Sequence, residues 1–258
     1  GFSLYKMMTN DKEDKLVLSR AEDALRIAER SYSVRAVGFL NPHQRSLIMK
    51  NIYPDADMKA SFEGGYEDAE RTMYVCRPEY AEADISDIIK VIRVWGRELG
   101  SLTHRDYLGS LMGLGITREN IGDILVSGNG AFIFVKAEIA EYIINNLDKI
   151  GRHGIKTELC DCSEAELPEP KTKEIKGTVS SLRLDAVLSL AAGISRSRAL
   201  DMISQELVSL NWEVISSPSH KVEEGDLISV RGTGRLRLKE VGGITRKGRI
   251  GITVLKYE

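Results

Sequence analysis

The stretch from Ser181 to Ile203 reads SLRLDAVLSLAAGISRSRALDMI and predicts two short helices joined by a tight turn. The apolar stripe of the first helix follows i, i+3, i+4, i+7 spacing and consists of Leu184, Val187, Leu188 and Ala191. Gly193 comes next, where a left-handed residue commonly ends a helix. The second helix is expected to begin with Ser195 as N-cap, followed by Arg196, Ser197 and Arg198. Hydroxyls, guanidiniums and free main-chain N–H groups at a helix start suit a phosphate, although the same residues are also compatible with an ordinary solvated surface.

A cationic strand follows this helical pair. Residues 227–230 predict one strand, and the next strand alternates three cations with two leucines. The alternating residues are Arg235, Leu236, Arg237, Leu238 and Lys239. At the two-residue period of a strand, the cations share one face and the leucines share the other. Between Arg231 and Arg249 there are seven Lys and Arg against one acid. A cationic stripe near a helix start with two arginines is typical of a nucleic-acid binder.

The charge distribution along the chain agrees with this interpretation. Residues 178–258 hold twelve Lys and Arg against nine Asp and Glu, a net charge of +3. The preceding 177 residues hold 24 against 29, a net charge of −5. Basic character is therefore concentrated at the C-terminal end of the chain.

The rest of the chain predicts an α+β protein with further domains. Residues 1–85 predict a small α+β domain, with a helix over 11–31 before a βαββ unit. Residues 86–160 predict the order β-α-β-β-α-β of a ferredoxin-like domain, including a helix over 137–150. Residues 161–177, with two prolines among charges, predict a semi-rigid linker. The C-terminal domain covers 178–258.

Several residues of the middle domain are candidates either for a structural position or for a contact with nucleic acid. Thr103 and Asp106 are expected to cap the helix that begins near His104, with Asp106 bonding back. Arg105 and Arg118 are less easily explained as caps and are candidates for a second RNA contact. Phe132 and Phe134 share a strand and either stack bases or, as is more common, belong to the core.

The cysteines and histidines do not predict a metal site or a cofactor. Three cysteines in 258 residues form no disulfide framework, and no apolar run approaches twenty residues, so we expect a cytoplasmic protein without a membrane partner. Cys160 and Cys162 could be half of a metal site, but no spaced pair of histidines accompanies them.

Five short motifs of the C-terminal third resemble an S4-type RNA-binding domain, the small αL module. These are Ser181–Asp185, Ser195–Ala199, Asn211–Trp212, Glu224–Asp226 and Ile228–Gly232, in the order and spacing of that module. The segment from Leu102 to Arg118, followed by Ile121–Ile124, resembles a motif of the bacterial YlmH family. The whole chain is similar to that family, in which the S4-type module is C-terminal.

Three hypotheses for the function follow. The leading one is a non-catalytic protein that docks on structured ribosomal RNA of the large (50S) subunit, together with tRNA, through phosphate contacts. The contact residues would be Arg183, Ser195, Arg196, Ser197, Arg198, Arg231, Arg235, Arg237 and Lys239. The YlmH resemblance implies ribosome-associated quality control with peptidyl-tRNA and a link to cell division. The alternatives are an RNA-modifying enzyme of the pseudouridine synthase or methyltransferase type, and a cell-division adaptor whose N-terminal domains bind protein partners. Against the enzyme, the sequence offers no dinucleotide-type glycine motif and no evident catalytic Asp.

Overall fold

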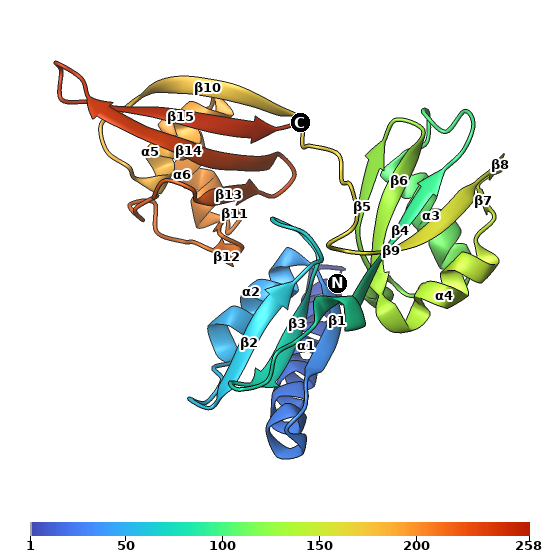
Figure 1. Ribbon diagram of the computed structural model, residues 1–258. Helices are drawn as coiled ribbons and strands as arrows, with labels where there is room; N and C mark the ends of the chain where they lie inside the picture. Colours follow the sequence, from blue (N-terminus) through green and yellow to red (C-terminus); the bar gives the residue numbers. More distant parts are fainter. Residues whose placement is uncertain (1) are drawn as a thin grey trace. The chain divides into compact units, whose positions relative to one another are not determined.

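The computed structural model describes the backbone of residues 2–258 and the side chains of residues 11–258. Gly1, the start of the first predicted domain, lies outside the described residues. The chain divides into two compact units, residues 1–168 and residues 169–258 (Figure 1). None of the helices in the described part combines the length and the apolar composition that crossing a bilayer requires.

The first unit begins with two helices on a three-stranded sheet. Its elements are α1 (Phe2–Ser31), β1 (Arg35–Leu40), α2 (Pro42–Asn51), β2 (Met58–Glu63) and β3 (Thr72–Pro78). The strands are antiparallel in the order β1-β3-β2. Asn41 caps α2 by a reciprocal capping box with Gln44, and Pro42 stands at the first helical position. Ala21 of α1 and Ile48 of α2 pack with Tyr74 of β3 in one core.

The second part of this unit has the predicted ferredoxin-like arrangement. Its main elements are β4 (Ile89–Trp95), α3 (His104–Gly113), β5 (Ile121–Ser127), β6 (Gly130–Lys136), α4 (Ala137–Asn146) and β9 (Lys156–Asp161). The sheet order β5-β6-β4-β9, with antiparallel neighbours, is that of a split βαβ fold. The helix predicted over 137–150 ends at Asn146, because the chain then turns into a small hairpin of β7 (Lys149–Ile150) and β8 (His153–Gly154).

The two N-terminal domains expected from the sequence share a core. Strand β3 is buried on both faces: Met73 and Val75 point away from α1 and pack with Val91 and Phe134 of the ferredoxin-like part. Phe134 is fully buried there, so its core interpretation is confirmed. A buried carboxylate adds a polar joint, meaning a set of hydrogen bonds that connects β5 to the segment between β2 and β3. Asp123 of β5 accepts hydrogen bonds from a tyrosine hydroxyl and two main-chain N–H groups of that segment. The donors are Tyr66 Oη (2.6 Å), Glu70 N (2.8 Å) and Arg71 N (2.9 Å).

The second unit is a six-stranded antiparallel sheet with two helices on one face (Figure 1). Its elements are β10 (Thr172–Val179), α5 (Leu184–Ala192), α6 (Arg196–Ser204), β11 (Val208–Leu210), β12 (Glu213–Val214), β13 (Leu227–Val230), β14 (Gly234–Ile244) and β15 (Ile250–Tyr257). The strand order is β10-β15-β14-β13-β11-β12. Gly193 ends α5 with φ of 64°, the left-handed conformation expected from the sequence.

Part of the predicted linker is a strand. Residues 161–177 were expected to be irregular, but Thr172–Val179 forms β10 and pairs along its whole length with Ile250–Tyr257. The exposed and charged composition of this segment is explained by its place at the sheet edge, where only Ile175, Gly177, Thr178 and Val179 are partly or fully buried. The C-terminal unit therefore begins near Glu169 and not at 178.

Candidate nucleic-acid interface

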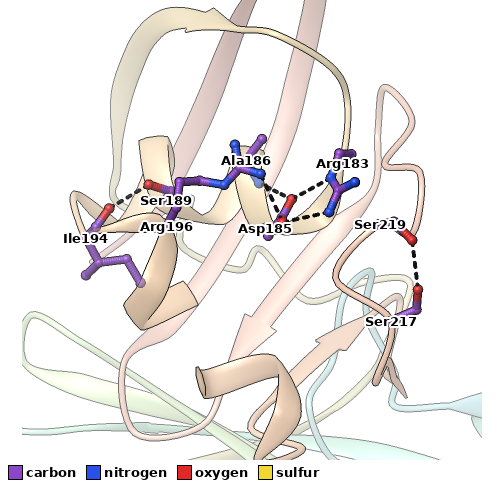
Figure 2. A network of polar contacts seen from close by, with 8 residues as sticks. All are labelled: Arg183, Asp185, Ala186, Ser189, Ile194, Arg196, Ser217 and Ser219. Carbon is purple, nitrogen blue, oxygen red and sulfur yellow. Dashed lines mark hydrogen bonds and ion pairs between the residues drawn. The ribbon is translucent and has the colours of Figure 1, made fainter. Parts of the chain in front are cut away.

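A buried carboxylate holds two arginines together where α5 and α6 begin (Figure 2). Asp185 lies in the first turn of α5, and its side chain is 2% exposed. Arg183 binds it through both Nε (3.1 Å) and Nη2 (3.0 Å), and Arg196 Nη2 lies 2.9 Å from Oδ2. The Ala186 main-chain N–H donates to Oδ1 at 2.8 Å. One carboxylate thus fixes guanidiniums from two separate helix starts.

The charge state of Asp185 follows from this arrangement. Burial alone would raise the pKa of its carboxyl, but the hydrogen bonds from Arg183 and Arg196, and their positive charges, lower the pKa below its ordinary value. The carboxylate is therefore ionised at neutral pH. The hydrogen bonds to this carboxylate also raise the pKa of Arg183.

The outer sides of both arginines remain available to a ligand. Their side chains are 44% and 48% exposed although both bind Asp185. Beside them, Ser195 accepts a hydrogen bond from the Arg198 N–H (3.1 Å) and so caps α6 as predicted. Ser197 and Arg198 are exposed in the first turn of α6. A helix start with fixed and exposed cations has the geometry of an anion-binding surface.

A loop from later in the chain adds a cation that the sequence did not predict. Leu184 N donates to His220 O (2.8 Å), and Asp185 N donates to Pro218 O (3.1 Å). A β-bridge between Arg183 and Lys221 places the exposed Lys221 beside the arginine pair. Within the same loop, the hydroxyls of Ser217 and Ser219 lie 3.1 Å apart (Figure 2). No local pattern could reveal this neighbour, because it depends on the return of a distant loop.

As predicted, strand β14 places its leucines on one face of the sheet and its cations on the other. The cations, however, lie on the face opposite α5 and α6, away from the start of α6. Leu236 and Leu238 are buried in the core with α5 and α6, so the alternating cations project from the face opposite these helices. Arg235 and Arg237 pair in register with Ser229 and Leu227 of β13. The stripe and the α6 start therefore form two separate surfaces, and the prediction that they lie near one another is wrong.

Each cation of the stripe has a partner within the unit. Arg237 donates from Nε to Tyr257 Oη (3.1 Å) and from Nη1 to Gly225 O (2.6 Å). The Arg235 guanidinium lies 5.0 Å from the centre of the Tyr257 ring. Lys239 Nζ binds Glu174 on β10 at 2.6 Å, and this hydrogen bond raises the pKa of Lys239. These contacts order the cations and partly neutralise the stripe.

The remaining predicted cations occupy separate places. Arg231 is exposed just beyond β13, and its N–H donates to Leu207 O after the C-terminal end of α6. In the first unit, Arg105 is exposed in the first turn of α3. Arg118 is half-buried and donates from Nη1 to the carbonyls of Ile121 (2.9 Å) and Gly122 (3.2 Å), which indicates a structural role.

The other local predictions for the first unit concern capping, aromatic and sulfur groups. Asp106 accepts from the Thr103 N–H (2.7 Å) and from its hydroxyl (3.0 Å), which confirms the back-bonding acid at the start of α3. Phe132 is partly buried beside the shared core. Cys160 and Cys162 are free thiols, and the described side chains contain no group of three or more His, Cys, Asp or Glu placed to hold a metal ion.

Family models match most of the chain. Residues 13–80 match the model described as "YlmH, N-terminal", and residues 88–164 match "Putative RNA-binding domain in YlmH". Residues 182–228 match the S4 domain, which includes the Asp185 carboxylate and both helix starts.

A relative that is matched over nearly the whole chain gives the same assignment. The Bacillus subtilis (strain 168) protein "Ribosome-associated protein quality control protein P2" is 33% identical over 244 residues, covering 94% of this chain and 95% of that protein. A solved structure, "Cell division protein ylmH from Streptococcus pneumoniae", is 27% identical, with a TM-score of 0.49 over 60% of this chain and 95% of its own. Since the three domain matches follow the family order and the Bacillus relative is matched over nearly its whole length, the chain belongs to the YlmH family.

Proposed function

We propose that this protein binds structured RNA of the large ribosomal subunit, together with peptidyl-tRNA, in ribosome-associated quality control, and that it acts without catalysis. The observation that carries the proposal is the pair of arginines that Asp185 holds at the exposed start of α6. The S4 match and the name of the Bacillus relative support the same assignment.

The mechanism that we propose is electrostatic and depends on shape. Arg183, Arg196, Arg198 and Lys221 contact phosphates, while Ser195 and Ser197 add hydroxyl or main-chain donors at the start of α6. Because Asp185 fixes two of the guanidiniums before binding, less side-chain entropy is lost when RNA arrives. Folded RNA is recognised largely through its backbone and its shape, which suits a surface of cations and hydroxyls.

A second cationic surface suits a second RNA segment. Arg231, Arg235, Arg237 and Lys239 stay in the proposal as phosphate contacts, but an RNA helix lying on the α6 start does not also cover the opposite sheet face. Two surfaces on one small unit support simultaneous contact with ribosomal RNA and tRNA. In the first unit, Arg105 stays a proposed contact, whereas the main-chain bonds of Arg118 argue against its use.

Sedimentation of cell lysate through sucrose gradients at low and raised salt tests the ribosome assignment. The protein is expected to migrate with the large subunit at low salt and to be released at high salt. The logarithm of the binding constant falls linearly with the logarithm of the salt concentration, with a slope of roughly −0.7 to −0.9 for each phosphate contact. The variant Arg198→Ala/Lys221→Ala removes two cations that do not bind Asp185, so it should dissociate at lower salt. The matched control Lys171→Ala/Lys173→Ala removes two exposed cations at the start of β10, one just before the strand and one within it, and should behave as the wild type. Migration at the top of the gradient under all conditions contradicts the proposal.

The absence of catalysis has a separate test. An RNA-modifying enzyme leaves its modification missing from ribosomal RNA or tRNA in cells that lack the gene. We expect unchanged modification maps in such cells, and a lost modification that the intact gene restores would replace the binding role with an enzymatic one.

A further inference from the structure

Strand β14 extends beyond its neighbour β13, and the β14–β15 hairpin ends in an exposed basic tip (Figure 1). Strand β13 pairs with β14 only between Gly234 and Arg237, whereas β14 continues to Ile244. All residues from Gly242 to Arg249 are exposed. The tip belongs neither to the α6 start nor to the cationic stripe on the sheet.

Hydrogen bonds within the tip give it a defined shape. Thr245 N donates to Arg249 O (2.7 Å), Gly248 N donates to Thr245 O (2.9 Å), and Arg249 N donates to the Thr245 hydroxyl (3.1 Å). The Arg249 guanidinium binds Thr178 on β10 through its hydroxyl (2.9 Å) and its carbonyl (2.8 Å). The turn is therefore closed at its base and tied to the neighbouring strand, so its main chain has a defined shape.

The tip combines positive charge with an exposed aliphatic group. Arg246 and Lys247 project at the turn, and no acid occurs between residues 241 and 249. Ile244 is 76% exposed, which is the largest exposure among the large hydrophobic side chains of the described chain. A single exposed aliphatic residue is common on protein surfaces, but here it stands at the end of a projecting strand beside two cations.

Two adjacent glycines expose the main chain next to Ile244. A Cβ on Gly243 would meet no atom within 4 Å, and its φ is not in the left-handed region, so the fold does not require glycine there. Glycine in a strand costs stability and often marks a place where a ligand or another backbone approaches closely. The open edge of β14 at this point is therefore suited to close external contact.

We propose that this tip enters the minor groove of double-stranded RNA. The A-form minor groove is wide and shallow and displays 2′-hydroxyls and sugar edges between two phosphate backbones. Ile244 packs on the sugars, Arg246 and Lys247 contact the flanking phosphates, and the main chain at Gly242–Gly243 lies against the groove edge. This inference rests on the proposed RNA-binding function and adds a contact that lies away from the α6 start.

The test measures binding of the full-length protein to purified large ribosomal subunits across a salt series. Arg246→Ala/Lys247→Ala should lower the log–log salt slope by about 1.4 to 1.8 and weaken binding by roughly tenfold or more, as expected for two lost phosphate contacts. Ile244→Ser should weaken binding with no change in slope, because it removes no charge. Gly243→Val should weaken binding while leaving the melting temperature unchanged or higher, since a β-branched residue favours the strand.

Controls separate this inference from the proposed function. Lys171→Ala/Lys173→Ala matches the charge change of the tip variant and should keep wild-type affinity. A photo-crosslinking amino acid at position 244 should attach to base-paired ribosomal RNA. Tip variants that bind as the control does, or crosslinks to ribosomal protein, overturn the groove contact but leave the proposed function standing if Arg198→Ala/Lys221→Ala still weakens binding. A wild-type protein that fails to bind the subunits at low salt overturns both.

Discussion

Replacing Asp185 by Asn should destabilise the C-terminal unit by about 2 to 3 kcal/mol. The carboxylate accepts two hydrogen bonds from Arg183, one from Arg196 and one from the Ala186 N–H. Hydrogen bonds to charged groups contribute roughly 1.5 to 3 kcal/mol each when buried, and neutral ones about 1 kcal/mol. The Asn side chain keeps one carbonyl oxygen but turns an amide N–H₂ toward a guanidinium. Since both arginines are nearly half-exposed and can be solvated, the loss falls below the roughly 3 to 5 kcal/mol of a fully buried pair.

Hydrogen exchange measures this loss in the intact protein. The amides of α5 report on opening of residues 169–258 separately from the first unit. We expect their protection in Asp185→Asn to fall by about 30- to 150-fold, the equivalent of 2 to 3 kcal/mol. For a unit of this size, each kcal/mol corresponds to roughly 4 to 8 °C in melting temperature.

Asp201→Asn is the matched control. Asp201 is an exposed carboxylate on α6 in the same unit, so its replacement makes the same charge change outside the arginine pair. It should alter stability by no more than about 0.5 kcal/mol. If Asp185→Asn were as stable as Asp201→Asn, the carboxylate would not be what holds the two helix starts together. In that case, any reduction of RNA binding in Asp185→Asn could not be attributed to the loss of the arrangement of the two helix starts.

Three further predictions concern pH, the polar joint and the thiols. Because the pKa of Asp185 is lower in the folded than in the unfolded state, its carboxylate stabilises the fold fully above the unfolded-state pKa, and this stabilisation is lost as pH falls through the folded-state pKa. The difference in free energy of unfolding between wild type and Asp185→Asn, measured with urea, should therefore be constant near neutrality and shrink below about pH 4. Asp123→Asn should lower the free energy of unfolding by about 2 kcal/mol and increase hydrogen exchange over residues 66–71, because the carboxylate accepts three hydrogen bonds from that segment. Unchanged exchange would show that these hydrogen bonds do not hold the segment in place. Burial raises the pKa of Cys76 to about 12 and that of Cys162 to about 11, so a thiol reagent at pH 8 should label them slowly until the protein is denatured, and rapid labelling of the native protein would argue against this burial.

Part of the site could be predicted because its signals are local. The Ser195 cap and the opposite facing of Leu236 and Arg237 each depend on the conformation of a few consecutive residues. The identity of Asp185 as the organising group could not be predicted, because its burial depends on loop 217–221 closing over the start of α5. The carbonyl partners of Arg118 lie only three and four residues further along the chain. Which groups a guanidinium contacts depends on how the chain folds around it, so these partners could not be predicted from the sequence alone.

The sequence alone determined the kind of elements, their order and the class of partner. Hydrophobic periodicity and capping residues specify helices and strands within windows of about ten residues, and the ferredoxin-like order followed from them. The tertiary structure decided which surfaces these elements form. It made residues 172–179 an edge strand by pairing them with a segment more than 70 residues away, and it placed the α6 start and the cationic strand on opposite sides of one sheet. Such contacts depend on long-range pairing and on burial of the remaining apolar faces, and no local pattern of residues encodes them.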